Sequence, residues 1–171
     1  PQSVAPWIGS AWRSHRTIYG ATDWGGSLRV SARYHRAPDR FPPDQTWPAL
    51  YLALSYGVCM GETMRHLPTD APISMFGNFC LSEIEVALGA VIDCRDVSIL
   101  GISPDTVLRD FDYDAGQELA AAVRARGCDG LLIPSATLLP DAALIVFPDM
   151  IQSDSLRIIR SIAPRLKRVQ A

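Results

Sequence analysis

Apolar side chains recur along the chain in patterns that predict both strands and helices. Between residues 79 and 101 they mostly alternate with smaller or polar side chains, which is typical of strands with one buried face. Shorter apolar stretches predict further strands, at residues 97–100, 130–134, 142–147 and 156–162. Strands therefore dominate the second half of the chain.

A helix is predicted from Ser55 through Leu67. Ser55 can cap its first turn, because a serine oxygen accepts a hydrogen bond from a free backbone N–H there. Pro68 ends it, because proline cannot continue a helix.

Two more helices are predicted between the strands. Asp114 with Gln117 resembles a capping box and starts a helix over residues 115–126, and Gly127 suits its end. A shorter helix over residues 103–111 starts at a Ser-Pro pair. No regular strand–helix–strand repeat, internal repeat or linker is visible, so we predict a single α+β domain over residues 1–171.

The first 47 residues have poor hydrophobic periodicity and are rich in Trp, Arg, Pro and Gly. We predict irregular chain here with short strands, one of them at residues 27–34. A basic, aromatic, loop-rich segment in a slightly acidic protein is one place to expect an anionic ligand. A Pro-rich cover over the core is the other interpretation, and composition leaves both open.

Composition excludes some classes of function. The 171 residues are 48% hydrophobic and 20% charged, which is ordinary for a chain that buries its own core. The net charge of −2 argues against direct binding of nucleic acid or an anionic membrane, which needs a basic surface. The basic cluster near the end is interpreted as a solvated face or tail, with Arg157 and Arg160 facing outward. No apolar run approaches the ~20 residues that span a bilayer.

The four cysteines form no Cys-x-x-Cys pair and sit among apolar residues. We therefore expect buried free thiols and a reducing, cytoplasmic location. The three histidines are scattered, so no metal site is expected. Ser135 follows a predicted strand and, without a paired histidine, reads as a turn residue rather than a nucleophile.

Glu62 and His66 are four residues apart and share one face of the predicted helix, which begins with Val58. A carboxylate beside an apolar stripe lies either at the wall of a pocket or at the boundary with solvent. The spacing alone does not choose between them.

An ordered set of residues resembles the RES domain, a family named for its Arg, Glu and Ser. In chain order the set is Trp12-Arg13, residues 31–35 (Ser-Ala-Arg-Tyr-His), residues 50–53 (Leu-Tyr-Leu-Ala), Glu62 and residues 127–136 (Gly-Cys-Asp-Gly-Leu-Leu-Ile-Pro-Ser-Ala). Glu62 follows Tyr51 by eleven residues. The resemblance spans about residues 12–163, and the order of the set is more specific than any single piece.

This resemblance implies a fold like that of ADP-ribosyltransferase toxins and a bacterial toxin that uses NAD⁺ as its substrate. Members of the family act in toxin–antitoxin pairs, usually with an Xre-like helix-turn-helix antitoxin that supplies the DNA-binding surface. The first expectation is cleavage of the nicotinamide–ribose bond of NAD⁺, with transfer of ADP-ribose to water or phosphate. A mono-ADP-ribosyltransferase that modifies a protein is the alternative, and a non-catalytic module that binds a nucleotide or an antitoxin is a second alternative.

The resemblance also implies roles for single residues. Arg13 and Arg33 match the family's arginines and would bind the pyrophosphate, since a planar guanidinium binds two oxygens at once. Tyr51 would offer its ring to the cationic nicotinamide.

The remaining matches lie on the predicted helix and after a predicted strand. Glu62 would stabilise the positive charge that develops on the ribose, as in glycoside hydrolysis. Ser135 would hydrogen-bond to the substrate, and His66 would orient Glu62 or contact the acceptor.

Two departures from the family pattern lie on the substrate side. The segment at 32–35 reads Ala-Arg-Tyr-His, without the usual Gly before the Arg or the Asn after the aromatic residue. Ser14 follows Arg13 where some relatives have Tyr. These departures leave open which group accepts ADP-ribose and which arginine contacts which phosphate.

Overall fold

A computed structural model describes residues 3–65, 67–68, 77–101, 103, 106, 112–135 and 141–163. The strands are β1 (Val4–Arg16), β2 (Leu50–Ala53), β3 (Phe79–Asp93), β4 (Gly130–Pro134), β5 (Ala142–Val146) and β6 (Leu156–Ile162). The helices are α1 (Tyr56–Arg65) and α3 (Asp114–Ala125), with 3₁₀ turns η1 (Gly25–Leu28), η2 (Pro43–Gln45) and η4 (Val97–Leu100). This is a single α+β domain, as predicted.

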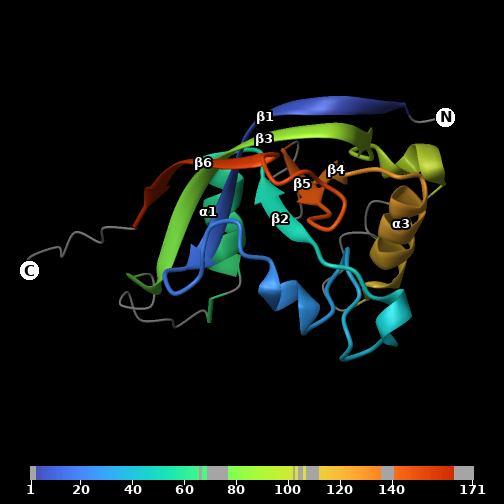
Figure 1. Ribbon diagram of the computed structural model, residues 1–171, viewed down its shortest axis with the longest axis horizontal. Coiled ribbons are helices and arrows are strands. Elements are labelled where there is room, and N and C mark those ends of the chain that lie inside the picture. Colours follow the sequence, from blue (N-terminus) through green and yellow to red (C-terminus); the bar gives the residue numbers. More distant parts are fainter. Residues whose placement is uncertain are drawn as a thin grey trace, which may run out of the picture.

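The strands form one sheet that closes on itself. The order is β1-β2-β5-β4-β3-β6, and β1 also pairs with β3, so the pairings from β1 round to β3 make a ring. The two long strands β1 and β3 run antiparallel, with Val4 opposite Ile92 and Arg16 opposite Phe79. Figure 1 shows them along one side of the molecule, with α1 and α3 at opposite ends.

Strand β1 corrects the prediction of irregular chain for the N-terminal segment. Its inward positions include Gly9 and Ala11 and its outward positions include Ile8, which is 78% exposed, so the hydrophobic alternation is weak. Pairing with β3 along its length supplies the hydrogen bonds that make it a strand. Long-range pairing thus overrides a poor local pattern.

The strand predicted at 27–34 is wrong. Its first residues form η1, and Val30 is 63% exposed. Ser31 is held instead by Asp39, whose carboxylate accepts hydrogen bonds from the Ser31 N–H (2.9 Å) and hydroxyl (2.6 Å). Such side-chain to backbone bonds favour compact loops over strands.

The start of α3 differs from the predicted capping box. Asp114 is the first helical residue, and the Tyr113 side chain at the N-cap makes no capping hydrogen bond. The Asp114 N–H donates instead to the Asp112 carboxylate at 3.3 Å. The Gln117 amide is buried and donates to the carbonyls of Ala32 (2.9 Å) and His35 (3.2 Å). Gln117 therefore anchors a distant loop rather than its own helix.

Three further predictions concern residues 97–100, Gly127 and residues 103–111. Residues 97–100 form a 3₁₀ turn rather than a strand, because Asp96 caps it through the Ser98 N–H (3.1 Å). Gly127 ends α3 at a φ of 74°, as predicted. The helix predicted at 103–111 lies almost entirely outside the described residues.

Packing and charge agree with several expectations. Three cysteines are buried, Cys80 is half-buried, and all four are free thiols. Arg157 and Arg160 face outward on β6 and pair with Glu85 and Glu83 on β3. Within the described ranges, no helix is long and apolar enough to cross a membrane.

Candidate active site

A cavity of about 620 Å³ opens between α1, β1, β2 and the loop that carries Arg33. Four of the residues singled out from the sequence line it: Arg13, Arg33, Tyr51 and Glu62. They come from four different segments, and the closing of the sheet brings these segments together. Ile133 and Pro134 of β4 and Ile145 of β5 complete the wall.

Arg13 points from β1 toward the loop that follows it. One guanidinium nitrogen, Nη1, donates to the carbonyl of Ala21 at 2.6 Å. Burial lowers its pKa to about 10, and the nearby charge of Asp23 acts in the opposite direction. Arg13 is therefore a partly desolvated cation at neutral pH, which strengthens its attraction for an anion.

Arg33 is held where its loop meets α3. A Cβ added at Gly116 would lie 2.4 Å from the Arg33 carbonyl oxygen and 3.0 Å from its Cγ. Gly116 thus lets the backbone of α3 approach the Arg33 segment closely, in addition to the Gln117 bonds one residue later.

We expect Gly116→Ala to displace the Arg33 segment. Alanine favours a helix by about 1 kcal/mol over glycine, but the atom it would meet is a backbone carbonyl that cannot rotate away. Overpacking of this kind costs about 1–3 kcal/mol, measurable by urea denaturation. Gly26→Ala is the matched control, since nothing lies within 4 Å of a Cβ there. A stabilised Gly116→Ala protein would show that this contact does not place Arg33.

Tyr51 lies on β2 with its hydroxyl turned away from solvent. The hydroxyl oxygen accepts from the backbone N–H of Tyr34 at 3.0 Å and lies 3.0 Å from Nδ1 of His35. The Tyr34 and Tyr51 rings have centroids 6.3 Å apart. Burial raises the pKa of the Tyr51 hydroxyl, so it stays protonated.

Glu62 lies on α1 at the cavity wall, which decides between the two positions left open by its spacing. The Ser55 hydroxyl accepts from the Val58 N–H (3.2 Å) and caps the helix as predicted. The same hydroxyl donates to the Asp141 carboxylate (3.0 Å), which joins the start of α1 to the start of β5. Glu62 is thus held on an anchored helix.

Cys59 lies one turn before Glu62 and also lines the cavity. Burial, and to a lesser degree the charge of Glu62, raises the pKa of its thiol to about 12. A thiol that stays protonated is a poor nucleophile. The thiol beside Glu62 therefore stays neutral and is not the nucleophile of this cavity.

Ser135 is not among the residues that line the cavity. It is 2% exposed and follows Pro134, which lines the cavity. Its backbone N–H donates to the Asp141 carbonyl at 2.8 Å. His66 lies outside the described residues.

The cavity also includes residues that sequence reasoning missed. Arg65 is three residues after Glu62 on α1, a spacing that could have placed it on the same wall. Trp12, which the RES-like set already includes beside Arg13, also lines the cavity and packs edge-on against Tyr56 at 5.2 Å between ring centroids. Tyr113 precedes α3 and belongs to no local motif, so nothing in the sequence marks it. Of the residues that the structure describes, no three His, Cys, Asp or Glu side chains gather as a metal site.

The comparisons agree with this architecture. The model of the RES domain family matches residues 10–164. The chain belongs to the RES domain family. A crystal structure of the M. tuberculosis MbcT–MbcA toxin–antitoxin complex contains a similar chain, with a TM-score of 0.77 and 22% identity over 93% of this chain and 85% of that one. No curated protein matches the chain.

The family match confirms the resemblance read from the ordered set of residues. The structural likeness, at this low identity, concerns the fold. The roles of the individual cavity residues in this RES domain are predictions.

Proposed function

We propose that this RES domain is the toxin of a bacterial toxin–antitoxin pair and that it cleaves the bond between nicotinamide and ribose in NAD⁺. The observation that carries the proposal is the gathering of two arginines, one tyrosine and one carboxylate in a single cavity. NAD⁺ presents a matching set of groups: an anionic pyrophosphate, a cationic nicotinamide and a ribose that becomes positive as the bond breaks.

Arg13 and Arg33 hold the pyrophosphate in this proposal. Both line the cavity, and Arg13 is partly desolvated there. Charge-assisted hydrogen bonds from a guanidinium to phosphate oxygens are about twice as strong as neutral ones. Two arginines therefore orient the dinucleotide as well as bind it.

Tyr51 and Glu62 act on the other half of the substrate. The Tyr51 ring stacks on nicotinamide, whose positive charge is attracted to an aromatic face. When the bond between ribose C1′ and the nicotinamide nitrogen breaks, both electrons leave with nicotinamide and C1′ becomes electron-poor. The Glu62 carboxylate stabilises that charge until an oxygen of water or phosphate bonds to C1′ and releases its proton to solvent.

The proposed protein partner of this chain is an antitoxin. The solved relative is described as a toxin–antitoxin complex, and we propose a cognate antitoxin, of the Xre-like helix-turn-helix type, for this chain. With a net charge of −2, this chain lacks the basic excess of a DNA-binding protein, so the antitoxin would provide the DNA-binding surface.

The decisive experiment follows NAD⁺ over time with purified protein, with and without phosphate. Loss of NAD⁺ with release of free nicotinamide supports the proposal, and dependence on phosphate identifies the acceptor. No loss in either buffer contradicts it. Labelled NAD⁺ with cell extract then tests protein ADP-ribosylation, the alternative, and the absence of labelled protein favours a binding-only module.

Arg13→Ala is expected to raise the KM for NAD⁺ by roughly 10- to 100-fold, because a hydrogen bond to a charged group is worth about 1.5–3 kcal/mol. Arg95→Ala is the matched control, because Arg95 pairs with Asp93 and is not a lining residue. Initial rates across NAD⁺ concentrations measure both. An unchanged KM for Arg13→Ala would remove this arginine from the substrate site.

A further inference from the structure

His35 connects the cavity to the loop behind it without lining the cavity itself. Its Nε2 lies 2.8 Å from the carbonyl oxygen of Val30, and its Nδ1 lies 3.0 Å from the Tyr51 hydroxyl. The side chain is buried, with 4% of the residue exposed.

The protons in this chain of bonds follow from the partners. A carbonyl oxygen only accepts, so Nε2 of His35 carries a proton and donates it to Val30. Burial lowers the pKa of His35, which keeps the ring neutral and leaves a lone pair on Nδ1. Among the described residues, the Tyr51 hydroxyl is the group within hydrogen-bond distance of that lone pair, so Tyr51 donates its proton to Nδ1.

The Tyr51 hydroxyl therefore makes hydrogen bonds both as a donor and as an acceptor. It donates to His35 and accepts from the Tyr34 backbone N–H at 3.0 Å. The His35 ring meets the Tyr51 ring edge-on at 5.7 Å and 71°. Because its hydroxyl proton is bonded to His35, Tyr51 lines the cavity as an aromatic ring with no proton to offer a substrate.

We propose that His35 is the positioning residue of Tyr51: as a neutral imidazole protonated on Nε2, it accepts the Tyr51 hydroxyl proton and fixes the aromatic ring in the cavity wall. The part of this inference that concerns nicotinamide rests on the proposed function. The hydrogen-bond arrangement itself does not depend on which ligand enters.

Substitutions separate positioning from simple packing. In His35→Asn, Oδ1 is as many bonds from Cα as Nδ1 is in histidine, so it can accept the Tyr51 proton. His35→Leu fills similar space but accepts nothing. Both variants lose the bond to Val30, and their difference therefore isolates the bond to Tyr51.

The expected kinetic signature is in KM. Nicotinamide is cationic in the bound substrate and loses that charge as the bond breaks, so the aromatic face favours the bound substrate over the transition state. His35→Leu is expected to raise the KM for NAD⁺ about 3- to 30-fold, the range of a cation–π contact of about 0.5–2 kcal/mol. The kcat is expected to rise by up to the same factor, because the lost contact stabilised the bound substrate more than the transition state. His35→Asn is expected to stay near the parent KM.

A spectroscopic measurement tests the arrangement independently of activity. In protein with ¹⁵N-labelled histidine, two-bond ¹H–¹⁵N spectra at neutral pH are expected to show His35 as the neutral Nε2–H form. Its protonation is expected below the usual pH of histidine, because burial outweighs the hydrogen bond to the Val30 carbonyl and the attraction of Asp39, which both raise the pKa. The Tyr51 hydroxyl and the Val30 carbonyl, both neutral groups, bond to the ring nitrogens, and the uncharged Gln117 amide of α3 donates to the His35 backbone carbonyl.

The outcomes are distinguishable. An Nδ1–H form of His35, or ordinary protonation near pH 6.5, overturns the inference whatever the enzyme does. If the parent neither binds nor cleaves NAD⁺, the proposed function fails. The NMR signals of the Tyr51 ring then decide whether His35 positions Tyr51. They are expected to shift in His35→Leu and return in His35→Asn. Equal KM values and equal ring signals in the folded Leu and Asn variants would also overturn the inference, with thermal melting to confirm folding.

Discussion

Replacing Glu62 by Gln is expected to lower kcat for NAD⁺ cleavage about 100- to 1,000-fold. The carboxylate lies on the cavity wall, where its charge acts on the ribose in the transition state. Removing one preorganised electrostatic group from an active site typically costs this much. Glutamine keeps the size of the side chain and removes the charge, so the KM for NAD⁺ is expected to change little.

The control for this variant is Glu85→Gln. Glu85 pairs with Arg157 between β3 and β6, and it is not a lining residue. Both variants are expected to melt close to the parent, because neither carboxylate is deeply buried. A Glu62→Gln protein that cleaves NAD⁺ at the parental rate would exclude Glu62 as the stabilising group.

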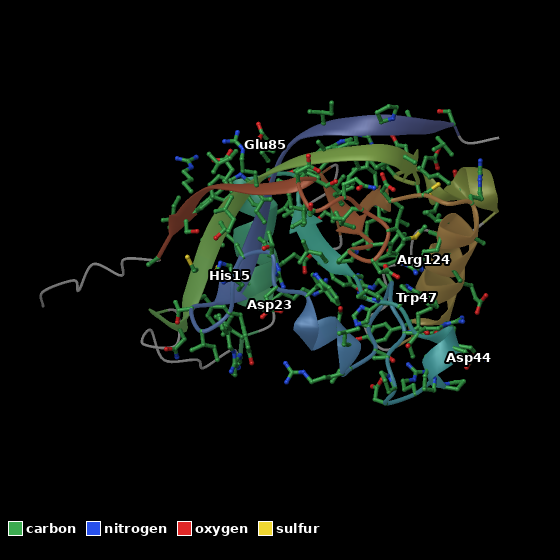
Figure 2. All side chains as sticks on the ribbon, viewed as in Figure 1. His15, Asp23, Asp44, Trp47, Glu85 and Arg124 are labelled. Atoms are coloured by element: carbon green, nitrogen blue, oxygen red, sulfur yellow. The ribbon has the colours of Figure 1, made fainter. Side chains whose placement is uncertain are left out.

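Trp47→Ala is expected to lower the free energy of unfolding by about 3–5 kcal/mol, the usual cost of truncating a buried tryptophan. Trp47 is 7% exposed, and its indole N–H donates to the Tyr34 carbonyl at 3.1 Å. The guanidinium of Arg36 lies 5.0 Å from its ring and that of Arg124 lies 5.6 Å from it. Figure 2 shows Trp47 and Arg124 beside α3, where this stack joins the loop to the helix. Urea denaturation measures the loss.

Trp47→Phe separates the contribution of the aromatic ring from that of the indole hydrogen bond. Phenylalanine keeps an aromatic ring for the two arginines but lacks the indole N–H, so the variant loses the bond to Tyr34. A lost hydrogen bond costs about 0.5–1.5 kcal/mol, well below the expected cost of Trp47→Ala. If Trp47→Ala cost less than Trp47→Phe, the stack would not be what holds the loop that carries Arg33.

Local sequence patterns predicted correctly those elements whose ends are set by residues close to them in the chain. Ser55 caps α1 as its position suggested, and Gly127 ends α3 with a positive φ. Strands β4, β5 and β6 lie within a residue of the apolar runs that predicted them. Caps, stops and short buried runs act over a few residues, so they can be read without knowing the rest of the fold.

Elements that depend on distant partners were missed or misread. Strand β1 forms because β3 lies beside it some 70 residues later, not because its own alternation is strong. The alternation at 27–34 faces no core, since the Asp39 carboxylate folds that segment into a loop. Gln117 resembled a capping residue, but its partners are carbonyls more than 80 residues away.

The amino-acid order alone was sufficient to predict membership in the RES family and the α+β class. It could not show that Arg13, Arg33, Tyr51 and Glu62 line one cavity while Ser135 lies just behind its wall. It also could not show that His35 holds the Tyr51 hydroxyl. These facts arise from the closing of the sheet through the β1–β3 pairing, which brings together segments whose separation along the chain leaves no local trace.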